Sequence, residues 1–387
     1  MSIRGKAFIA GVYEHPLREI PDRSSSQIQA EVAFGALADA GLTLADVDGY
    51  FTDSAHGFGG LSMADYLGLK VRHIDSTETG GSSYVVHVGH AAEAIAAGKC
   101  SVALITMAGR PRSAGMGMGR GGEPVPDSVF EGLWGMSGAV TGYALAATRH
   151  MYQYGTTSAQ LAEVKVAASL HAQHNPNAFL PKAVTVQEVL DSPMISSPLH
   201  RMDCCVVTDS GGAIVVVSPE IAASLPRTCV KVLGHGEAVK HADMGRLDLT
   251  YTGAVVSGPI AFAEAGVTQA DIKYASIYDS FTITVIETIE DLGFCEKGKG
   301  GEFVLDGGLV APFGKLPFNT DGGGLCNNHP SNRGGVTKVI EAVRQLRGEA
   351  NGPTQVPNCN IALAHGTGGS IGARMGSSTL IMGQEDA

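Results

Sequence analysis

The chain has 387 residues, of which 44% are hydrophobic and 17% charged, so it can build a large globular core and two domains or two fused halves. The formal net charge is −11, and the basic residues are scattered along the sequence, which excludes a nucleic-acid-binding surface. No apolar run reaches the roughly 18 residues of a membrane span, and no signal peptide precedes the first strand pattern, so we expect a cytoplasmic protein without a membrane anchor.

The seven cysteines lie mostly in apolar runs, and none forms a Cys-x-x-Cys pair. Paired cysteines at short spacing are typical of zinc sites and redox motifs, whereas isolated buried cysteines are typical of reduced thiols. We therefore expect neither disulfides nor a metal site.

Taken from the N-terminus, residues 7–12 are predicted as a buried strand, and the serines at 24–26 can cap the helix that comes next. A helix is predicted over residues 82–97 and a strand over 101–107. The most informative feature is a repeat, because the helix end, short connection and strand at 38–49 align without a gap with residues 263–274.

The segments after the two copies also match in kind. The second copy is followed by a glycine turn, a predicted helix over 336–346 and a predicted strand over 360–364. Two matches in the same order favour a duplicated α/β unit, in which each half is a sheet with helices on its faces. We place the halves at residues 1–225 and 226–387.

Between the halves runs an insertion-like region at about 109–200. Its first loop, residues 109–122, holds Arg110, Arg112 and Arg120 among glycines and methionines, and is predicted as a mobile or interface loop with phosphate contact as the alternative. Trp134 and Met136 form an apolar patch that either lines a pocket or packs. A helix over 141–154 comes next, and Ser158 is expected to cap the one after it.

A glycine run at 322–324 leads to Asn-His-Pro at 328–330. Glycines let the backbone come close to a ligand, and a histidine beside a helix start can donate to an oxyanion or move a proton. The alternative is an ordinary loop histidine. Ligands of α/β folds sit beyond the carboxyl ends of the strands, which groups residues 278–281 (Tyr-Asp-Ser-Phe), His329 and residues 365–369.

These motifs, in this order, resemble the thiolase superfamily, and specifically its sterol-carrier-protein-X type, over nearly all 387 residues. Asn-His-Pro is similar to the family's Gly-His-Pro box, and Tyr-Asp-Ser-Phe stands where relatives carry Asn-Glu-Ala-Phe or His-Asp-Cys-Phe. The resemblance implies an α/β, thiolase-like fold with two duplicated halves in a layered α-β-α-β-α arrangement. It also implies a homodimer and, as in many such relatives, a small partner protein combining an OB fold with a zinc ribbon.

The chain departs from the family at the nucleophile. Family thiolases place a reactive cysteine at the start of the helix in the first half, and that position falls on Gly81. Ser82 and Ser83 come directly after it, but a serine without an adjacent base is a poor nucleophile, and a pair of serines here is typical of helix capping. The second family cysteine is replaced by His365.

A thiolase scaffold without its cysteine still offers a thioester pocket, and this suits retro-aldol cleavage, which needs no acyl-enzyme. The sequence resembles the cysteine-lacking thiolase-like aldolases of steroid side-chain degradation. That resemblance implies that Tyr278 is a catalytic acid/base, and it places a second catalytic tyrosine of the relatives on His329.

We therefore expect an enzyme that cleaves a β-hydroxyacyl-CoA with a steroid or other bulky acyl chain, CoA being part of the substrate and no further cofactor or metal being needed. The alternatives are a thiolase-type acyltransferase and a non-catalytic acyl-CoA-binding subunit. The expected catalytic residues are Tyr278, His329 and His365. The expected substrate-binding residues are Gly81, Ser82, Ser83, Gly368 and Gly369.

Overall fold

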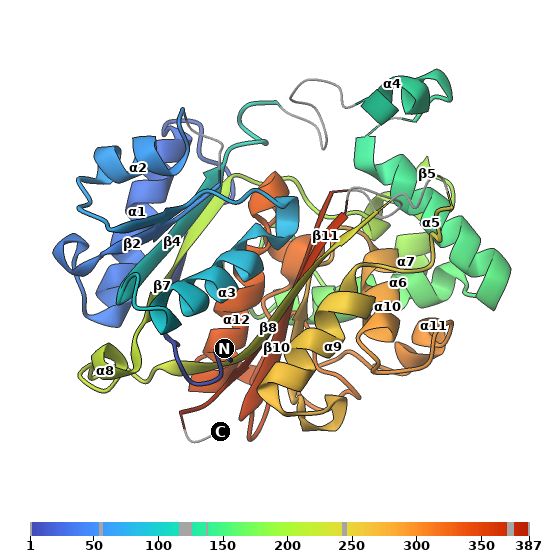
Figure 1. Ribbon diagram of the computed structural model, residues 1–387. Coiled ribbons are helices and arrows are strands. Elements are labelled where there is room, and N and C mark those ends of the chain that lie inside the picture. The colour runs from blue at the N-terminus through green and yellow to red at the C-terminus, as the bar shows by residue number, and fades with distance from the viewer. Residues whose placement is uncertain are drawn as a thin grey trace.

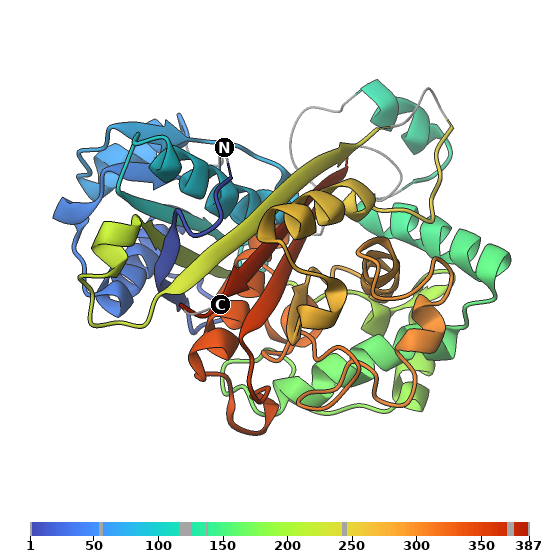
Figure 2. The ribbon, with the colours of Figure 1, turned by 60° about the horizontal axis from the view of Figure 1, so that its bottom comes forward.

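The computed structural model describes residues 2–53, 57–115, 126–136, 138–241, 246–369 and 375–385. Strands of both halves form one continuous nine-stranded sheet in the order β3-β2-β4-β7-β1-β8-β11-β10-β9. The halves join where β1 and β8 pair antiparallel over Phe8↔Lys231 and Ile9↔Val230. Figure 2 shows β8 running from this junction alongside β10 and β11. The strands of the sheet are β1 (Phe8–Glu14), β2 (Gly49–Phe51), β3 (His73–Asp75), β4 (Val102–Gly109), β7 (Ser210–Val217), β8 (Val230–Lys240), β9 (Tyr274–Ile277), β10 (Ile361–Gly369) and β11 (Met375–Gly383).

Helices and sheet stack in five layers, α-β-α-β-α (Figure 1). The middle layer is made by α3 and α12, whose side chains share one core with both parts of the sheet. Helices α1 and α2 cover the outer face of the N-terminal strands, while α5, α6, α9 and α10 pack against the C-terminal strands. The larger helices are α1 (Ser25–Ala40), α2 (Gly60–Leu67), α3 (Ser83–Ala96), α5 (Gly138–Tyr154), α6 (Ser158–Ala172), α9 (Ala254–Ala265), α10 (Thr282–Asp291) and α12 (Val336–Arg347). Smaller elements are α4 (Pro126–Leu133), α7 (Val186–Leu190), α8 (Pro219–Ala222), α11 (Gly300–Phe303) and the hairpin β5 (Met194–Ser196) and β6 (Leu199–His200).

The sequence repeat is a structural repeat. Helix α1 ends at Gly41 with φ 72° and α9 ends at Gly266 with φ 64°, a left-handed conformation that glycine adopts without strain. A single 3₁₀ turn comes after each, closed by Asp46 or Asp271, whose carboxylate accepts from the backbone N–H three residues earlier at 2.8 Å. The chain then enters β2 or β9. The layered, duplicated α/β fold expected from the sequence is confirmed, and the boundary predicted at 225–226 lies between α8 and β8.

Local expectations in the inserted region were less accurate. The cap of α6 is Thr157 rather than Ser158, because the Thr157 side chain accepts from the N–H of Gln160. Trp134 is 88% exposed, so it does not pack in the core. A single sequence pattern does not tell which apolar side chains of an insertion find a partner.

Two of the three arginines in the first loop contact the protein itself. Arg110 donates to the backbone carbonyls of Ile20 and Pro21, and Arg112 donates to Glu19. These contacts tie the start of the loop to the segment after β1. Arg120 lies outside the described residues.

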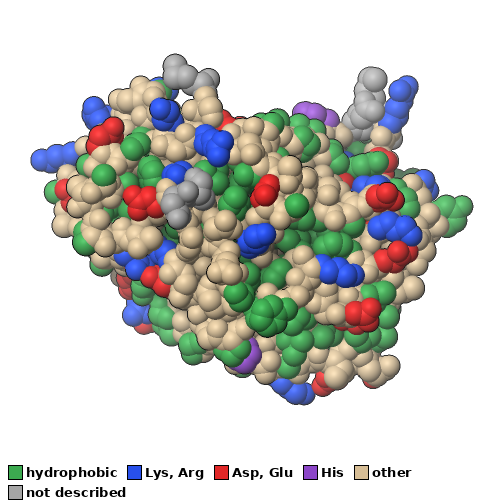
Figure 3. Space-filling model, turned by 90° about the horizontal axis from the view of Figure 1, so that it is seen from below, with side chains coloured by type: hydrophobic (Ala, Val, Ile, Leu, Met, Phe, Trp, Pro, Cys, Tyr) green, Lys and Arg blue, Asp and Glu red, His purple; other side chains and the backbone are tan. Residues whose placement is uncertain are grey.

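On the face seen in Figure 3, lysine and arginine side chains alternate with acidic ones instead of forming a basic stripe. None of the helices in the described parts of the chain is long and apolar enough to cross a membrane. All seven cysteines are free thiols. Within the same described parts, no group of three or more His, Cys, Asp or Glu side chains is arranged to hold a metal ion.

Candidate active site

Tyr278 and His329 meet at the carboxyl end of β9. Tyr278 comes directly after the strand, and its backbone N–H donates to the His365 carbonyl at 2.9 Å. Its hydroxyl lies 2.8 Å from Nε2 of His329, with the two rings edge to face and their centroids 5.5 Å apart. Each residue is 5% exposed. Two candidates that are 51 residues apart in the sequence therefore form one hydrogen-bonded pair.

Burial keeps both members of this pair uncharged at neutral pH. It lowers the pKa of the His329 imidazole to about 4 and raises the pKa of the Tyr278 hydroxyl well above its ordinary value of 10. A neutral imidazole has one donor and one acceptor nitrogen, and Nδ1 of His329 has no partner among the described residues. Moving the phenol proton onto the imidazole would create buried charge, so the resting pair keeps this proton on Tyr278.

Asp279 fixes the loop that carries His329. This buried carboxylate accepts from the backbone N–H groups of Gly324 at 2.8 Å and Leu325 at 3.0 Å, and it pairs with Nζ of Lys338 at 3.0 Å. The loop includes one π-helical turn, Gly323–Asn327, a rare geometry that is frequent at functional sites. Asp279 thus positions the loop, as expected for the residue on the opposite side of the chain from Tyr278.

Gly81 lies against the ring of Tyr278. A Cβ atom placed on Gly81 would stand 2.4 Å from Cζ of Tyr278 and 2.3 Å from the Thr367 carbonyl oxygen, both far closer than real Cβ contacts. Gly335 approaches from the other side, since its Cβ would stand 2.1 Å from the Gly81 carbonyl oxygen. The space in which a nucleophilic side chain at position 81 would begin is therefore filled by Tyr278.

The two central-layer helices begin at this same point. Gly81 lies in the 3₁₀ turn that leads into α3, and Gly335 is the residue before α12. Each helix start leaves unpaired N–H groups and the positive end of a helix dipole. Two such ends beside the Tyr278–His329 pair favour negative charge, which suits stabilisation of a developing oxyanion.

The serines after Gly81 are engaged with the backbone. The Ser82 hydroxyl donates to the Thr79 carbonyl at 2.8 Å, and the Ser83 hydroxyl donates to the Gly80 carbonyl at 2.8 Å. Ser82 also lines a cavity of about 310 Å³ between the start of α3 and the ends of β8 and β11. The Glu78 carboxylate hydrogen-bonds the Ser83 side chain, whereas the Ser82 hydroxyl is bonded to Thr79, and both serines hold the turn before α3.

His365 is placed differently from the other two catalytic candidates. Its Nδ1 lies 2.9 Å from the Thr379 hydroxyl on β11, and its other ring nitrogen has no partner among the described residues. Burial lowers its pKa to about 3. Its carbonyl supports Tyr278, whereas its ring hydrogen-bonds to β11 and not to the Tyr278–His329 pair.

The glycines after His365 pack against the turn before α3. A Cβ on Gly368 would stand 1.8 Å from the Thr79 carbonyl oxygen, and Gly369, with φ 81°, accepts from the Tyr143 hydroxyl at 3.5 Å. Gly368 is therefore brought beside Gly81, as expected. Gly369 borders Tyr143 instead.

Two residues near the pair were not predicted from the sequence. Tyr143, from α5, stacks on Phe281 with ring centroids 4.4 Å apart, and its charge would raise the pKa of Tyr278. Arg333, held by Asp53 at 2.7 Å, opposes the effect of burial, which raises the pKa of Tyr278. Arg333 stands three residues after the Asn-His-Pro motif, which could have marked it. Nothing in the local sequence of α5 marks Tyr143.

Comparison with known proteins identifies a family model and several similar proteins. Residues 236–384 match the family model described as Thiolase C-terminal domain-like. The chain is 32% identical over 381 residues to a steroid side-chain-cleaving aldolase of Thermomonospora curvata, covering 94% of this chain and 96% of that protein. It is 33% identical over 369 residues to 17-hydroxy-3-oxo-4-pregnene-20-carboxyl-CoA lyase of Mycobacterium tuberculosis, covering 91% of this chain and 94% of that protein.

An acetyl-CoA acetyltransferase of Methanothermobacter thermautotrophicus is as similar, at 32% identity over 379 residues, covering 94% of this chain and 96% of that one. Among solved structures, the Ltp2-ChsH2(DUF35) aldolase superposes with a TM-score of 0.90 at 30% identity over 100% of both chains. Sequence identity alone does not separate a lyase from an acyltransferase, so the geometry at Gly81 decides between them.

Proposed function

The chain belongs to the thiolase superfamily, and from this premise we propose that it cleaves a β-hydroxyacyl-CoA by retro-aldol chemistry without forming an acyl-enzyme. One observation carries the proposal: Tyr278 fills the place of the thiolase nucleophile at Gly81 and presents its hydroxyl to His329 at 2.8 Å. Relatives of similar sequence named as an aldolase and a CoA lyase support the same reaction.

The reaction needs one proton to leave and one to return. Tyr278 takes the proton of the β-hydroxyl as its own passes to Nε2 of His329, and the bond between the α and β carbons breaks. A ketone or aldehyde leaves, and the electron pair stays on the thioester as an enolate. The converging starts of α3 and α12 stabilise its oxygen. The proton then returns from His329 through Tyr278 to the α carbon, giving the shortened acyl-CoA.

His365, Gly368 and the Gly81–Ser83 turn complete the proposed site. Gly368 and Gly81 let Thr79 and Tyr278 pack closely at the start of α3, beside which the thioester would bind, Ser82 and Ser83 hold that turn, and His365 supports Tyr278 through its carbonyl. Gly369 borders the acyl side, beside Tyr143. CoA enters as part of the substrate, and the mechanism requires neither a metal nor a separate cofactor.

The proposal extends to substrate and partners. The activities for which the two lyase-type relatives are named favour a steroid or another bulky acyl group. The solved aldolase is named as a complex with a DUF35 protein, which favours a partner protein here. That this partner combines an OB fold with a zinc ribbon, and that the chain forms a homodimer, are proposals that rest on the family resemblance. Free thiols at all seven cysteines fit a cytoplasmic location.

The acyltransferase is the second candidate, favoured by the similarity to an acetyl-CoA acetyltransferase. The two reactions are separated by supplying a β-hydroxyacyl-CoA, or a β-ketoacyl-CoA with free CoA, to the protein alone and with its partner. We expect release of ketone or aldehyde from the first substrate and no CoA-dependent cleavage of the second. Thiolysis of the β-ketoacyl-CoA, or an acyl group trapped covalently on the chain, would refute the proposal.

A further inference from the structure

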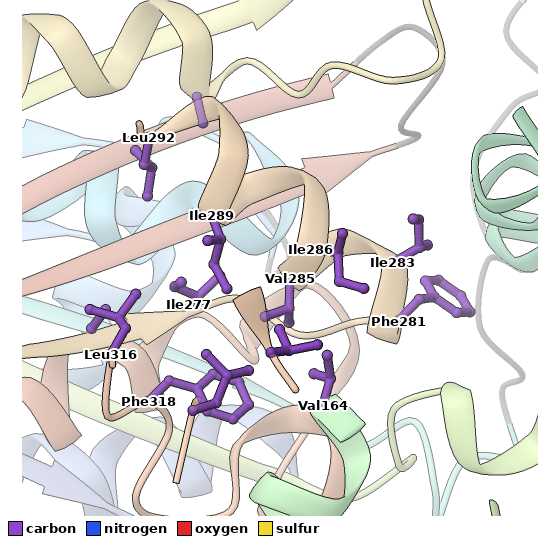
Figure 4. Packing of buried hydrophobic residues seen from close by; sticks show 14 of the residues in the cluster. Val164, Ile277, Phe281, Ile283, Val285, Ile286, Ile289, Leu292, Leu316 and Phe318 are labelled. Carbon is purple, nitrogen blue, oxygen red and sulfur yellow. The ribbon is translucent and has the colours of Figure 1, made fainter. Parts of the chain in front are cut away.

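The two members of the reacting pair are held in place by different means. The segment that carries Tyr278 is flanked by Ile277 and Phe281, whose side chains are fully buried and pack in the core of the C-terminal half (Figure 4). His329 instead follows two buried asparagines. Polar contacts therefore have a larger share in fixing His329 than in fixing Tyr278.

The ring of His329 is not oriented in the way that is usual for a reacting histidine. A hydrogen bond at one ring nitrogen commonly sets the tautomer and the direction of the other. In His329, Nε2 lies 2.8 Å from the Tyr278 hydroxyl, and Nδ1 has no partner among the described residues. Two glycines confine the ring, since Cβ atoms placed on Gly324 and Gly334 would stand 3.2 and 3.0 Å from its Cδ2 atom. The direction of the ring therefore depends on where the His329 backbone is held.

The hydroxyl of Thr208 holds that backbone. It accepts from the backbone N–H of His329 at 2.9 Å, and the Thr208 N–H donates to the His329 carbonyl at 3.4 Å. The same hydroxyl donates to the side-chain oxygen of Asn328 at 2.8 Å. Thr208 and Asn328 are both 0% exposed, so these hydrogen bonds are removed from solvent. One buried hydroxyl thus connects the backbone of the reacting histidine to the side chain before it.

A buried ion pair fixes the direction of these hydrogen bonds. Nδ2 of Asn328 donates to Glu14 at 2.8 Å, and Glu14 pairs with Arg18 at 2.7 Å. Because Glu14 accepts from the Asn328 amide, the oxygen of that amide is turned toward Thr208 and receives its proton. The oxygen of the Thr208 hydroxyl is then free to accept from the His329 N–H.

We propose that Thr208 is a positioning residue of the reaction, and that its hydroxyl orients the His329 imidazole toward the Tyr278 hydroxyl. The inference rests on the proposed function, because it concerns the proton relay of that reaction. Without the hydroxyl, the buried N–H of His329 would lose its acceptor, and the backbone would have to move to find another. A displacement of about 1 Å at the reacting atoms can lower a rate roughly a hundred-fold.

The first test measures turnover. The probe is a decalinyl-acetyl-CoA with a hydroxyl on the ring carbon that carries the acetyl group, so that retro-aldol cleavage releases decalone and acetyl-CoA. Thr208→Val removes the hydroxyl and keeps the shape, and we expect it to lower kcat at least about ten-fold with KM within about two-fold. Thr208→Ser keeps the hydroxyl and should retain most of kcat. An unchanged kcat in Thr208→Val would overturn the inference.

A double variant separates positioning from a general loss of structure. In a chain that already carries Tyr278→Phe the relay is broken, so adding Thr208→Val should lower kcat by less than about two-fold. If Thr208→Val lowers kcat by the same factor with and without Tyr278→Phe, the hydroxyl does not act through the pair and the inference is wrong.

The second test needs no turnover and decides the role of Thr208 even if the wild type does not cleave the probe. Histidines are labelled with an NMR-active nitrogen isotope, and the ring signals of His329 are identified by their loss in His329→Phe. Tyr278→Phe shows how the Nε2 signal shifts when its hydrogen bond is removed. Thr208→Val should shift the signal in the same direction, whereas Thr208→Ser should leave it in place. An unmoved signal in Thr208→Val would overturn the inference, and a moved signal in a protein without lyase activity would reject only the proposed reaction.

Thr354→Val is the matched control. Thr354 is 2% exposed, and its hydroxyl donates to the Asn351 carbonyl at 2.8 Å, in a turn that contributes no residue to the site. We expect this variant to lose stability and to keep both kcat and the His329 signal. A loss of kcat as large as that in Thr208→Val would show that lower stability alone explains both.

If Thr208→Val does not fold, Thr208→Cys takes its place. It differs from Thr208→Ser only in having sulfur for oxygen, and a thiol is a weak hydrogen-bond donor and acceptor. We expect its kcat to lie several-fold below that of Thr208→Ser, with the His329 signal shifted. Equal kcat and equal signals in these two variants would show that the hydroxyl does not position the histidine.

Discussion

The Cβ position of Gly81 and the ring of Tyr278 compete for one space, with only 2.4 Å between that position and Cζ of the tyrosine. The absence of a cysteine at position 81 and the presence of Tyr278 are therefore linked, because both side chains would need the same space. In the proposed mechanism, the site has exchanged a nucleophile for an acid/base.

Gly81→Cys should therefore not restore a thiolase. We expect it to lower the free energy of unfolding by about 1–3 kcal/mol, as overpacking of a core does. No acyl-cysteine should form. Tyr278→Ala in the same chain should recover only part of the stability, since the clash with the Thr367 carbonyl oxygen remains. Denaturant unfolding and intact-mass spectrometry check both points, and an acylated Gly81→Cys protein would contradict them.

Tyr278→Phe removes the hydroxyl and keeps the ring. We expect lyase turnover to fall at least a hundred-fold, roughly the scale of a general acid/base, while the dissociation constant of a non-cleavable acyl-CoA stays within a few-fold. His329→Phe should lower turnover by a similar factor, because the relay needs both members. Turnover that survives in Tyr278→Phe would remove this tyrosine from the mechanism.

Asp279 and Lys338 form an ion pair that is almost completely buried, with exposed side-chain fractions of 0% and 1%. Asp279→Ala leaves the lysine unpaired and the Gly324 N–H without its acceptor, so we expect a loss of about 3–5 kcal/mol of stability. The double variant Asp279→Leu with Lys338→Met should be less destabilised than Asp279→Ala. A double-mutant cycle measured by denaturant unfolding gives the coupling, and additive effects would show that the pair is not coupled.

The pH dependence of stability should reveal the buried, neutral histidines. Burial lowers the pKa of His87 from 6.5 to about 4. Between pH 6.5 and 4 the unfolded chain therefore binds a proton there that the folded chain does not, and stability falls as the pH falls through this window. His87→Leu should reduce the slope of stability against pH by up to about 1.4 kcal/mol per pH unit. Denaturant unfolding at about pH 7, 6 and 5 tests this, and parallel curves for the two proteins would disprove it.

The fold could be predicted from the sequence because the features that reveal the duplication are local. Helix end, glycine cap and aspartate-closed turn recur in both halves, and these depend on neighbouring residues only. Tyr278 and His329 could be found because each stands in a motif. The contact between Gly81 and Tyr278 could not be predicted, since it depends on how the start of α3 packs against the end of β9.

Other features of the site depend entirely on tertiary packing. Tyr143 lies on a helix whose sequence shows no functional pattern. His365 stood in a motif as clear as that of His329, yet strand alternation points its ring at Thr379. The register of the strands determines which way such a side chain points, and this register cannot be read from the sequence before the strand pairs are known.

Helices α3 and α12 come from different halves, and their first turns touch through Gly81 and Gly335. A chain of half this length would contain only one such helix start. It could form the pocket only by associating with a second copy of itself.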